Sequence, residues 1–148
     1  MGIRLSLALQ REGHRIRVFD LPRCDYEAIE GLENVRVIRG DIRDAGTMEE
    51  AVDGTQTGIH LAALLPPNSE RDRELTWQIN VGGTQKVLEA CSRLAAPPHL
   101  IFASSVSTYG DTSAEPPPLK ASRPQRPSDI YGESKVAAEG VILSSGLN

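Results

Sequence analysis

The sequence predicts an α/β fold built on a doubly wound parallel sheet. Short apolar segments typical of strands alternate along the chain with amphipathic segments typical of helices. Such alternation favours parallel strands joined by right-handed helical crossovers. Polar residues follow several expected strands, among them Asp20, Asp41 and Ser104. Because ligands of these sheets bind at the carboxyl ends of the strands, we expect the functional site at that edge.

Composition places the chain among ordinary globular proteins. Its 148 residues carry a net charge of -4, with 24% charged and 39% hydrophobic residues, which suits one domain with a core. The acidic balance argues against a nucleic-acid partner. Cys24 and Cys91 form neither a disulfide framework nor a metal-binding spacing, and we expect buried thiols. No apolar run suits a membrane span or a signal peptide, so the expected location is the cytoplasm.

The first predicted elements are a helix and a strand. Residues 2–12 place apolar side chains on one broad side, and Gly13 is positioned to end this helix. Residues 15–19 alternate between polar and apolar types, which predicts a strand with Asp20 at its carboxyl end.

The next segment predicts two more strands with a short helix between them. Residues 35–38 form a strand that stops at Gly40. Thr47 and Glu50 fit a capping box that opens a helix. Residues 59–63 are predicted to form a buried strand end.

The second half predicts a long helix, a strand, a long loop and a final helix. The helix covers residues 73–94, with an inward face of Leu75, Ile79, Val87, Leu88 and Cys91. Residues 99–104 form the strand, and residues 106–129 form a proline-rich loop. A loop of this length in a compact domain is usually functional. The last helix is expected from residue 131 to residue 144.

Tyr131 and Lys135 could carry acid–base chemistry. They stand four residues apart at a helix start and so share one face. A free phenol has a pKa near ~10, and an adjacent ammonium favours the phenolate. Lowering such a pKa by ~3 units takes about 4 kcal/mol. The phenolate could then accept a proton from an alcohol while a hydride leaves the same carbon. A helical surface pair would show the same spacing.

A hydroxyl-rich segment follows the strand of residues 99–104. Ser105 and Ser107 stand where the ligand edge of the sheet is expected. A hydroxyl at this edge could hold a substrate oxygen beside Tyr131. A serine-rich turn without a function is the alternative.

Five segments together resemble one family. They are Gly40-Asp41-Ile42-Arg43-Asp44, His60-Leu61-Ala62-Ala63, Asn80-Val81-Gly82-Gly83-Thr84, Ser104-Ser105-Val106-Ser107-Thr108-Tyr109-Gly110 and Tyr131-Gly132-Glu133-Ser134-Lys135. Their order and spacing are similar to those of extended short-chain dehydrogenases/reductases, the NAD-dependent epimerases and dehydratases. The resemblance covers nearly the whole chain and implies a Rossmann-like fold. It specifies the superfamily more closely than the substrate.

The resemblance assigns roles position by position. It implies that Ser105 hydrogen-bonds the reacting oxygen, that Tyr131 is the general acid or base, and that Lys135 binds the nicotinamide ribose. The cofactor-binding positions that it implies are Gly2, Asp20, Asp41, Ile42, Leu61, Ala62, Ala63, Asn80, Ser104, Tyr131 and Lys135. The implied substrate-binding positions are Leu65, Ser105, Val106, Ser107 and Tyr131.

Asp20 bears on the choice of cofactor. An acidic residue at the end of this strand accepts hydrogen bonds from the adenosine ribose and repels a 2′-phosphate. NAD is therefore favoured over NADP, although Arg23 nearby keeps NADP open. A strand-terminal turn residue is the alternative reading of Asp20.

The resemblance also implies parts that lie outside residues 1–148. Gly2 fits the last glycine of the family's Gly-x-x-Gly-x-x-Gly loop and would allow close helix–sheet packing there. The first strand, the later strands and the substrate domain would lie outside the chain, which would be a Rossmann domain truncated at both ends. We expect this chain alone to be inactive and the full-length parent to be a homodimer.

Three functions remain open from the sequence. The leading one is an NAD-dependent epimerase or dehydratase of a nucleotide sugar, similar to UDP-glucose 4-epimerase. The second is an NAD(P)-dependent reductase or dehydrogenase of a sterol-like or flavonoid-like substrate. The third is a non-catalytic dinucleotide-binding regulator, which would need only the cofactor contacts.

Overall fold

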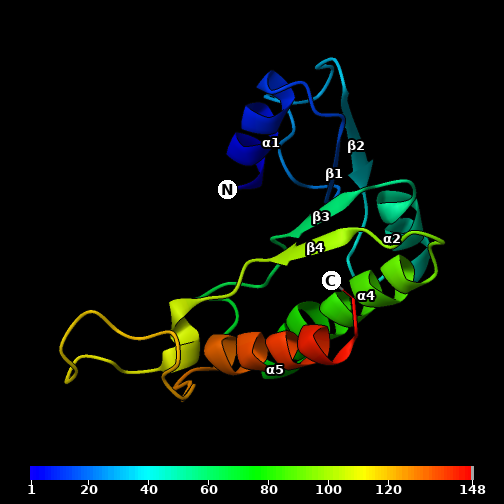
Figure 1. Ribbon diagram of the computed structural model, residues 1–148. Coiled ribbons are helices and arrows are strands. Elements are labelled where there is room, and N and C mark those ends of the chain that lie inside the picture. The colour runs from blue at the N-terminus through cyan, green and yellow to red at the C-terminus, as the bar shows by residue number, and fades with distance from the viewer. Residues whose placement is uncertain (148) are drawn as a thin grey trace.

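A computed structural model describes residues 1–147 of the chain, and its elements alternate between helices and strands (Figure 1). In chain order they are α1 (Gly2–Arg11), β1 (Ile16–Asp20), β2 (Val35–Arg39), α2 (Ala45–Val52), β3 (Thr57–His60), α3 (Arg73–Trp77), a π-helical turn (Gln78–Gly82), α4 (Gly83–Ser92), β4 (His99–Phe102), a 3₁₀ turn (Val106–Tyr109) and α5 (Ile130–Ser144). The α/β class predicted from the sequence is confirmed.

The strands form two parallel pairs instead of one sheet. β1 pairs with β2 in a register that matches Val18 to Val37, and β3 pairs with β4 in a register that matches Ile59 to Ile101. Within residues 1–147, no strand joins the two pairs. The parallel direction confirms the expected topology. The separation of β1 from β3 agrees with the expectation that the strand between them lies outside this chain.

The helices place the core on one side of the strands. α4 and α5 lie side by side along β3 and β4, and α2 packs against α4, while α1 lies apart from these helices next to β1 (Figure 1). The buried cluster consists of Ile38, Ile42, Met48, Ala51, Val87, Ala90 and Cys91. This packing leaves the carboxyl ends of the strands, with the loops that follow them, as the place for a site.

The predicted helix of residues 73–94 is observed from residue 73 to residue 92, with a π-helical turn inside it. α3 ends at Trp77, and a π-helical turn separates it from α4. The side chain of Asn80 in this turn is only 2% exposed. Single π turns inside helices are frequent at functional sites.

Two further expectations about element ends are wrong. α2 begins at Ala45, not at Thr47, because the carboxylate of Asp44 accepts a hydrogen bond from the backbone N–H of Thr47 and caps the helix. β3 ends at His60, so Ala62 and Ala63 lie in the loop beyond it.

The role expected of Gly2 stays a prediction. A Cβ atom placed on Gly2 would meet no atom within 4 Å in residues 1–147, and the strand expected to pack there lies outside these residues. Separately, none of the helices in residues 1–147 combines the length and the apolar character needed to cross a bilayer.

Candidate active site

The start of α5 is packed tightly against the 3₁₀ turn that follows β4. A Cβ atom on Gly132 would lie 2.5 Å from the backbone oxygen of Ser107, so only glycine permits this approach. Ser105 caps the 3₁₀ turn, and its Oγ accepts a hydrogen bond of 3.1 Å from the N–H of Ser107. The packing therefore brings the segment of Ser105 and Ser107 to the first turn of α5, which carries Tyr131.

Lys135 lies one turn further along α5 and is nearly fully buried. Its side chain is 2% exposed, and Nζ lies 3.9 Å from the centre of the Phe102 ring at the end of β4. Burial lowers the pKa of Lys135 from 10.5 to about 8, against the opposing effect of the Glu139 carboxylate. The positive charge of Lys135 therefore lies at the carboxyl end of β4.

Asn80 connects the loop after β3 to α5. Its Oδ1 accepts from the N–H of Leu64 at 2.7 Å, and its Nδ2 donates to the Leu64 oxygen and to Ser134 Oγ, at 3.2 and 2.9 Å. Ser134 Oγ in turn donates to the backbone oxygen of Tyr131 at 2.7 Å. Asn80 is buried under this network, so its side chain acts on the site through its neighbours.

His60 is buried behind Lys135 and is held neutral. Burial, together with the positive charge of Lys135, lowers the pKa of His60 to about 4. The Thr84 hydroxyl donates its single proton to the backbone oxygen of Asn80 at 2.6 Å. His60 Nε2, at 2.9 Å, must therefore be the donor to Thr84 Oγ1.

The side chains expected beside the adenosine differ in exposure and in their contacts. Asp20 is exposed at the end of β1, and its Oδ1 accepts from the N–H of Leu21 at 2.8 Å. Asp41 is held by both nitrogens of the Arg43 fork, which lowers its pKa to about 2. The Ile42 side chain lies in the core against Gly83.

The carboxyl ends of β3 and β4 carry small side chains on the expected cofactor side. Ala62 is exposed, and Leu61 and Ala63 are half-buried. The hydroxyl of Ser104 donates to the carboxylate of Glu139 on α5. Their role beside the cofactor stays a prediction.

The positions expected to contact substrate include two exposed apolar side chains. Leu65 is 55% exposed and Val106 is 70% exposed, in the loops after β3 and β4. Single exposed apolar side chains are common on protein surfaces, so the substrate-binding role of these two residues stays a prediction.

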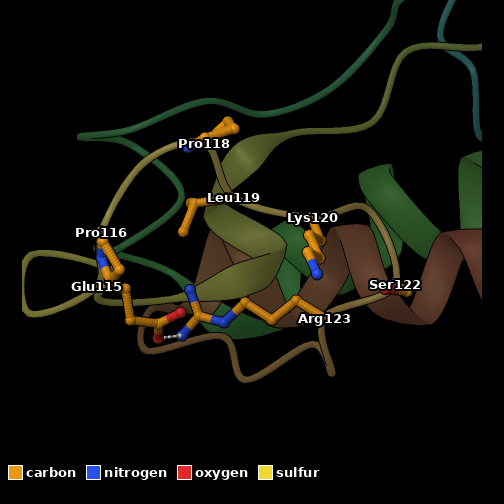
Figure 2. Close-up of a pocket in the computed structure, with 7 residues that line it drawn as sticks. All are labelled: Glu115, Pro116, Pro118, Leu119, Lys120, Ser122 and Arg123. Carbon is orange, nitrogen blue, oxygen red and sulfur yellow. Dashed lines mark ion pairs between the residues drawn. The ribbon is translucent and has the colours of Figure 1, made fainter.

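The proline-rich loop contains a pocket of its own. The cavity measures about 290 Å³. Figure 2 shows the side chains that line it: Glu115, Pro116, Pro118, Leu119, Lys120, Ser122 and Arg123. Arg123 pairs with Glu115, but its Nη1 is buried with no hydrogen-bond partner in residues 1–147. The pocket is lined by none of the three residues that the sequence nominates for catalysis.

Sequence reasoning missed three residues that support this arrangement. Thr84 and Ser134 complete the buried hydrogen bonds just described, and both lie inside the segments that carry the family resemblance. Glu70 accepts hydrogen bonds from the first backbone amides of α5. No local signal marks Glu70, because its partners lie 60 residues later in the chain.

Parallel strand pairs, a helical crossover from β3 to β4, and a Tyr-x-x-x-Lys helix at the carboxyl end of β4 are features of the extended short-chain dehydrogenase family. Residues 1–147 match the 3-beta hydroxysteroid dehydrogenase/isomerase family. The chain belongs to this family, within the NAD-dependent epimerases and dehydratases.

Relatives of known function support the family at the level of sequence and fold. The chain is 33% identical to D-erythronate dehydrogenase of Cupriavidus necator, over 97% of this chain and 46% of that protein. It is 30% identical to a 3 beta-hydroxysteroid dehydrogenase/Delta 5-->4-isomerase of Mycobacterium tuberculosis, over 97% and 40%. The structure of UDP-glucose 4-epimerase from Thermus thermophilus in complex with NAD superposes with a TM-score of 0.86 and 28% identity, over 99% and 49%. The chain spans less than half the length of each.

Proposed function

We propose that the complete protein is an NAD-dependent epimerase or dehydratase of a nucleotide sugar, to which this chain contributes the cofactor-binding portion. The observation that carries the proposal is Lys135, a buried ammonium on the helix of Tyr131 that makes no ion pair within residues 1–147 and lies at the carboxyl end of β4. A non-catalytic sensor would have no use for this costly arrangement, because it needs only the cofactor contacts.

The cofactor fits the residues present. NAD, when bound, accepts a hydride from the substrate carbon and returns it. The exposed carboxylate of Asp20 would hold the adenosine ribose, and the small side chains of Ala62 and Ala63 would let the dinucleotide lie along the loop after β3. The solved relative from Thermus thermophilus is described with NAD bound, which supports this choice.

The chain's own residues would handle the proton. Tyr131 would remove it from the sugar hydroxyl, and Ser105 Oγ would hold the same oxygen in place. Lys135 would stabilise the phenolate through its positive charge, which a pKa of about 8 leaves largely in place near neutral pH. Enzymes place such fixed charges where charge develops in the transition state.

A net dehydrogenase of an apolar alcohol is the second candidate. Leu65 and Val106 expose apolar surface where substrate would approach, and two of the relatives are named as dehydrogenases. The same three residues would serve both reactions. In a dehydrogenase the hydride stays on the cofactor, whereas in an epimerase it goes back to the substrate.

The test uses the complete gene product. Interconversion of UDP-glucose and UDP-galactose without net NADH would support the epimerase, while NADH formed once per turnover from a sterol or other secondary alcohol would support the dehydrogenase. Tyr131→Phe should lower turnover by about 10²–10⁴-fold without changing NAD binding. Tyr109→Phe removes a phenol whose hydroxyl contacts only the Ala121 oxygen within residues 1–147, and it should keep its activity. Unchanged turnover in Tyr131→Phe would refute the proposal.

A further inference from the structure

Glu70 binds the first two backbone amides of α5 from a distant loop. Its Oε2 accepts from the N–H of Ile130 at 2.9 Å, and its Oε1 accepts from the N–H of Tyr131 at 3.0 Å. The first amides of any helix have no partner within the helix. Glu70 therefore satisfies two of them with two separate oxygens of one carboxylate.

The local cap of α5 leaves these two amides free. Asp129 is the N-cap residue, and its carboxylate accepts from the N–H of Gly132 at 2.6 Å. A capping side chain normally reaches the second or third amide of the helix only. The amides of Ile130 and Tyr131 thus depend on a residue from elsewhere in the chain.

The loop that carries Glu70 is itself fixed. Ser69 is fully buried, and its hydroxyl donates to Glu70 Oε1 at 2.9 Å. The Thr76 hydroxyl lies within hydrogen-bond distance of the backbone oxygens of Ser69 and Asp72, at 2.9 and 2.7 Å. Burial acts to raise the pKa of Glu70, but the hydrogen bonds from Ile130, Ser69 and Tyr131 outweigh it and lower the pKa. The carboxylate therefore stays ionised, as two amide donors require.

We propose that Glu70 is a positioning residue that sets the place of Tyr131 by fixing the first turn of α5 to the loop after β3. Leu65 lies in the same loop. The hydrogen bonds of Glu70 therefore also connect the expected substrate-binding loop to the helix of Tyr131. The inference deepens the proposed function and rests on the role assigned there to Tyr131.

The test is Glu70→Gln in the complete gene product. The glutamine side chain has the shape of the glutamate side chain, but one of the two acceptor oxygens becomes an NH₂ group. This group faces the backbone N–H of Ile130 or Tyr131 and cannot accept a hydrogen bond from it. Hydrogen exchange at the amides of the first turn of α5 should accelerate, and kcat should fall by about 10–100-fold with unchanged NAD affinity, since small displacements of a reacting group have effects of this size. Glu70→Ala should behave alike.

Glu133→Gln is the matched control. It removes the 2.7 Å ion pair between Glu133 and Arg73, which joins the same helix to α3, without touching the clamped amides. Its exchange and its kcat should match the wild type. Three results would each overturn the proposal. The first is unchanged amide hydrogen exchange in Glu70→Gln, and the second is faster exchange with an unchanged kcat. The third is an equal loss of kcat in Glu133→Gln. A failure of the proposed function would instead appear as full turnover in Tyr131→Phe, which the exchange measurement does not depend on.

Discussion

Replacing Lys135 by methionine should stabilise the fold while it removes catalysis. The ammonium is 2% exposed, and within residues 1–147 no ion pair joins it to a carboxylate. The ammonium makes a cation–π contact with the ring of Phe102. A buried charge without a partner is costly, and a methionine of similar length would fill the space without that cost.

The magnitude follows from the shift in pKa. A fall from 10.5 to about 8 corresponds to about 3 kcal/mol by which the folded protein disfavours the charged form. The contact with the Phe102 ring returns about 1 kcal/mol, which the uncharged methionine side chain would forgo. The free energy of unfolding of Lys135→Met should therefore exceed that of the wild type by about 1–2 kcal/mol near pH 7, measured on the cofactor-free protein.

The sign of the pH dependence is fixed by the direction of the shift. The folded pKa lies below the unfolded one, so the unfolded chain binds more protons between about pH 8 and 10.5. The cost to the wild type is fully present below pH 8 and disappears as the pH rises through this window. The advantage of the variant should shrink over the same range.

Urea unfolding across this pH range, together with turnover at neutral pH, is the assay. Lys86→Met is the control, because Lys86 is a half-buried residue whose ammonium is paired with Glu89, and its effect should stay within about 0.5 kcal/mol. A Lys135→Met protein that is less stable than the wild type near pH 7, or an advantage that does not change between pH 8 and 10.5, would refute the reasoning.

Two further variants test the contacts around α5. Gly132→Ala would place a Cβ atom 2.5 Å from the Ser107 oxygen and push α5 away from the 3₁₀ turn, so turnover should fall by about 10–100-fold; Gly140→Ala, on the same helix with no atom within 4 Å, should keep its activity. Asn80→Ala would leave the N–H and oxygen of Leu64 without their partner, and urea unfolding should show a loss of about 2–3 kcal/mol. A loss below about 0.5 kcal/mol, roughly the scatter of surface substitutions, would contradict the second prediction.

The sequence was sufficient where local patterns decide the structure. The strand predicted at residues 15–19 is observed as Ile16–Asp20, and the helix predicted from residue 131 begins at Ile130. Alternation marks a strand because successive side chains point to opposite faces, and helical periodicity marks one face of a helix. Both signals lie within a few residues of the element that they predict.

Local patterns failed where a distant contact decides. The periodicity of residues 73–94 predicted the long helix, observed over residues 73–92, but not the π turn inside it, where the side chain of Asn80 binds Leu64 and Ser134. The capping box at Thr47 failed for a different reason. Asp44, three residues earlier, is an equally good cap, and the pattern alone could not rank the two.

The arrangement around α5 shows why a Tyr-x-x-x-Lys spacing is weak evidence alone and strong in this setting. The spacing only ensures that two side chains share a face. What places that face at the end of β4 is a set of contacts from distant segments: Gly132 against the 3₁₀ turn, Asn80 on Ser134, and Glu70 on the first amides. A surface helix with the same motif would need none of them. Two of these contacts join the loop after β3 to α5, so a displacement of this loop must also strain the hydrogen bonds at the start of α5.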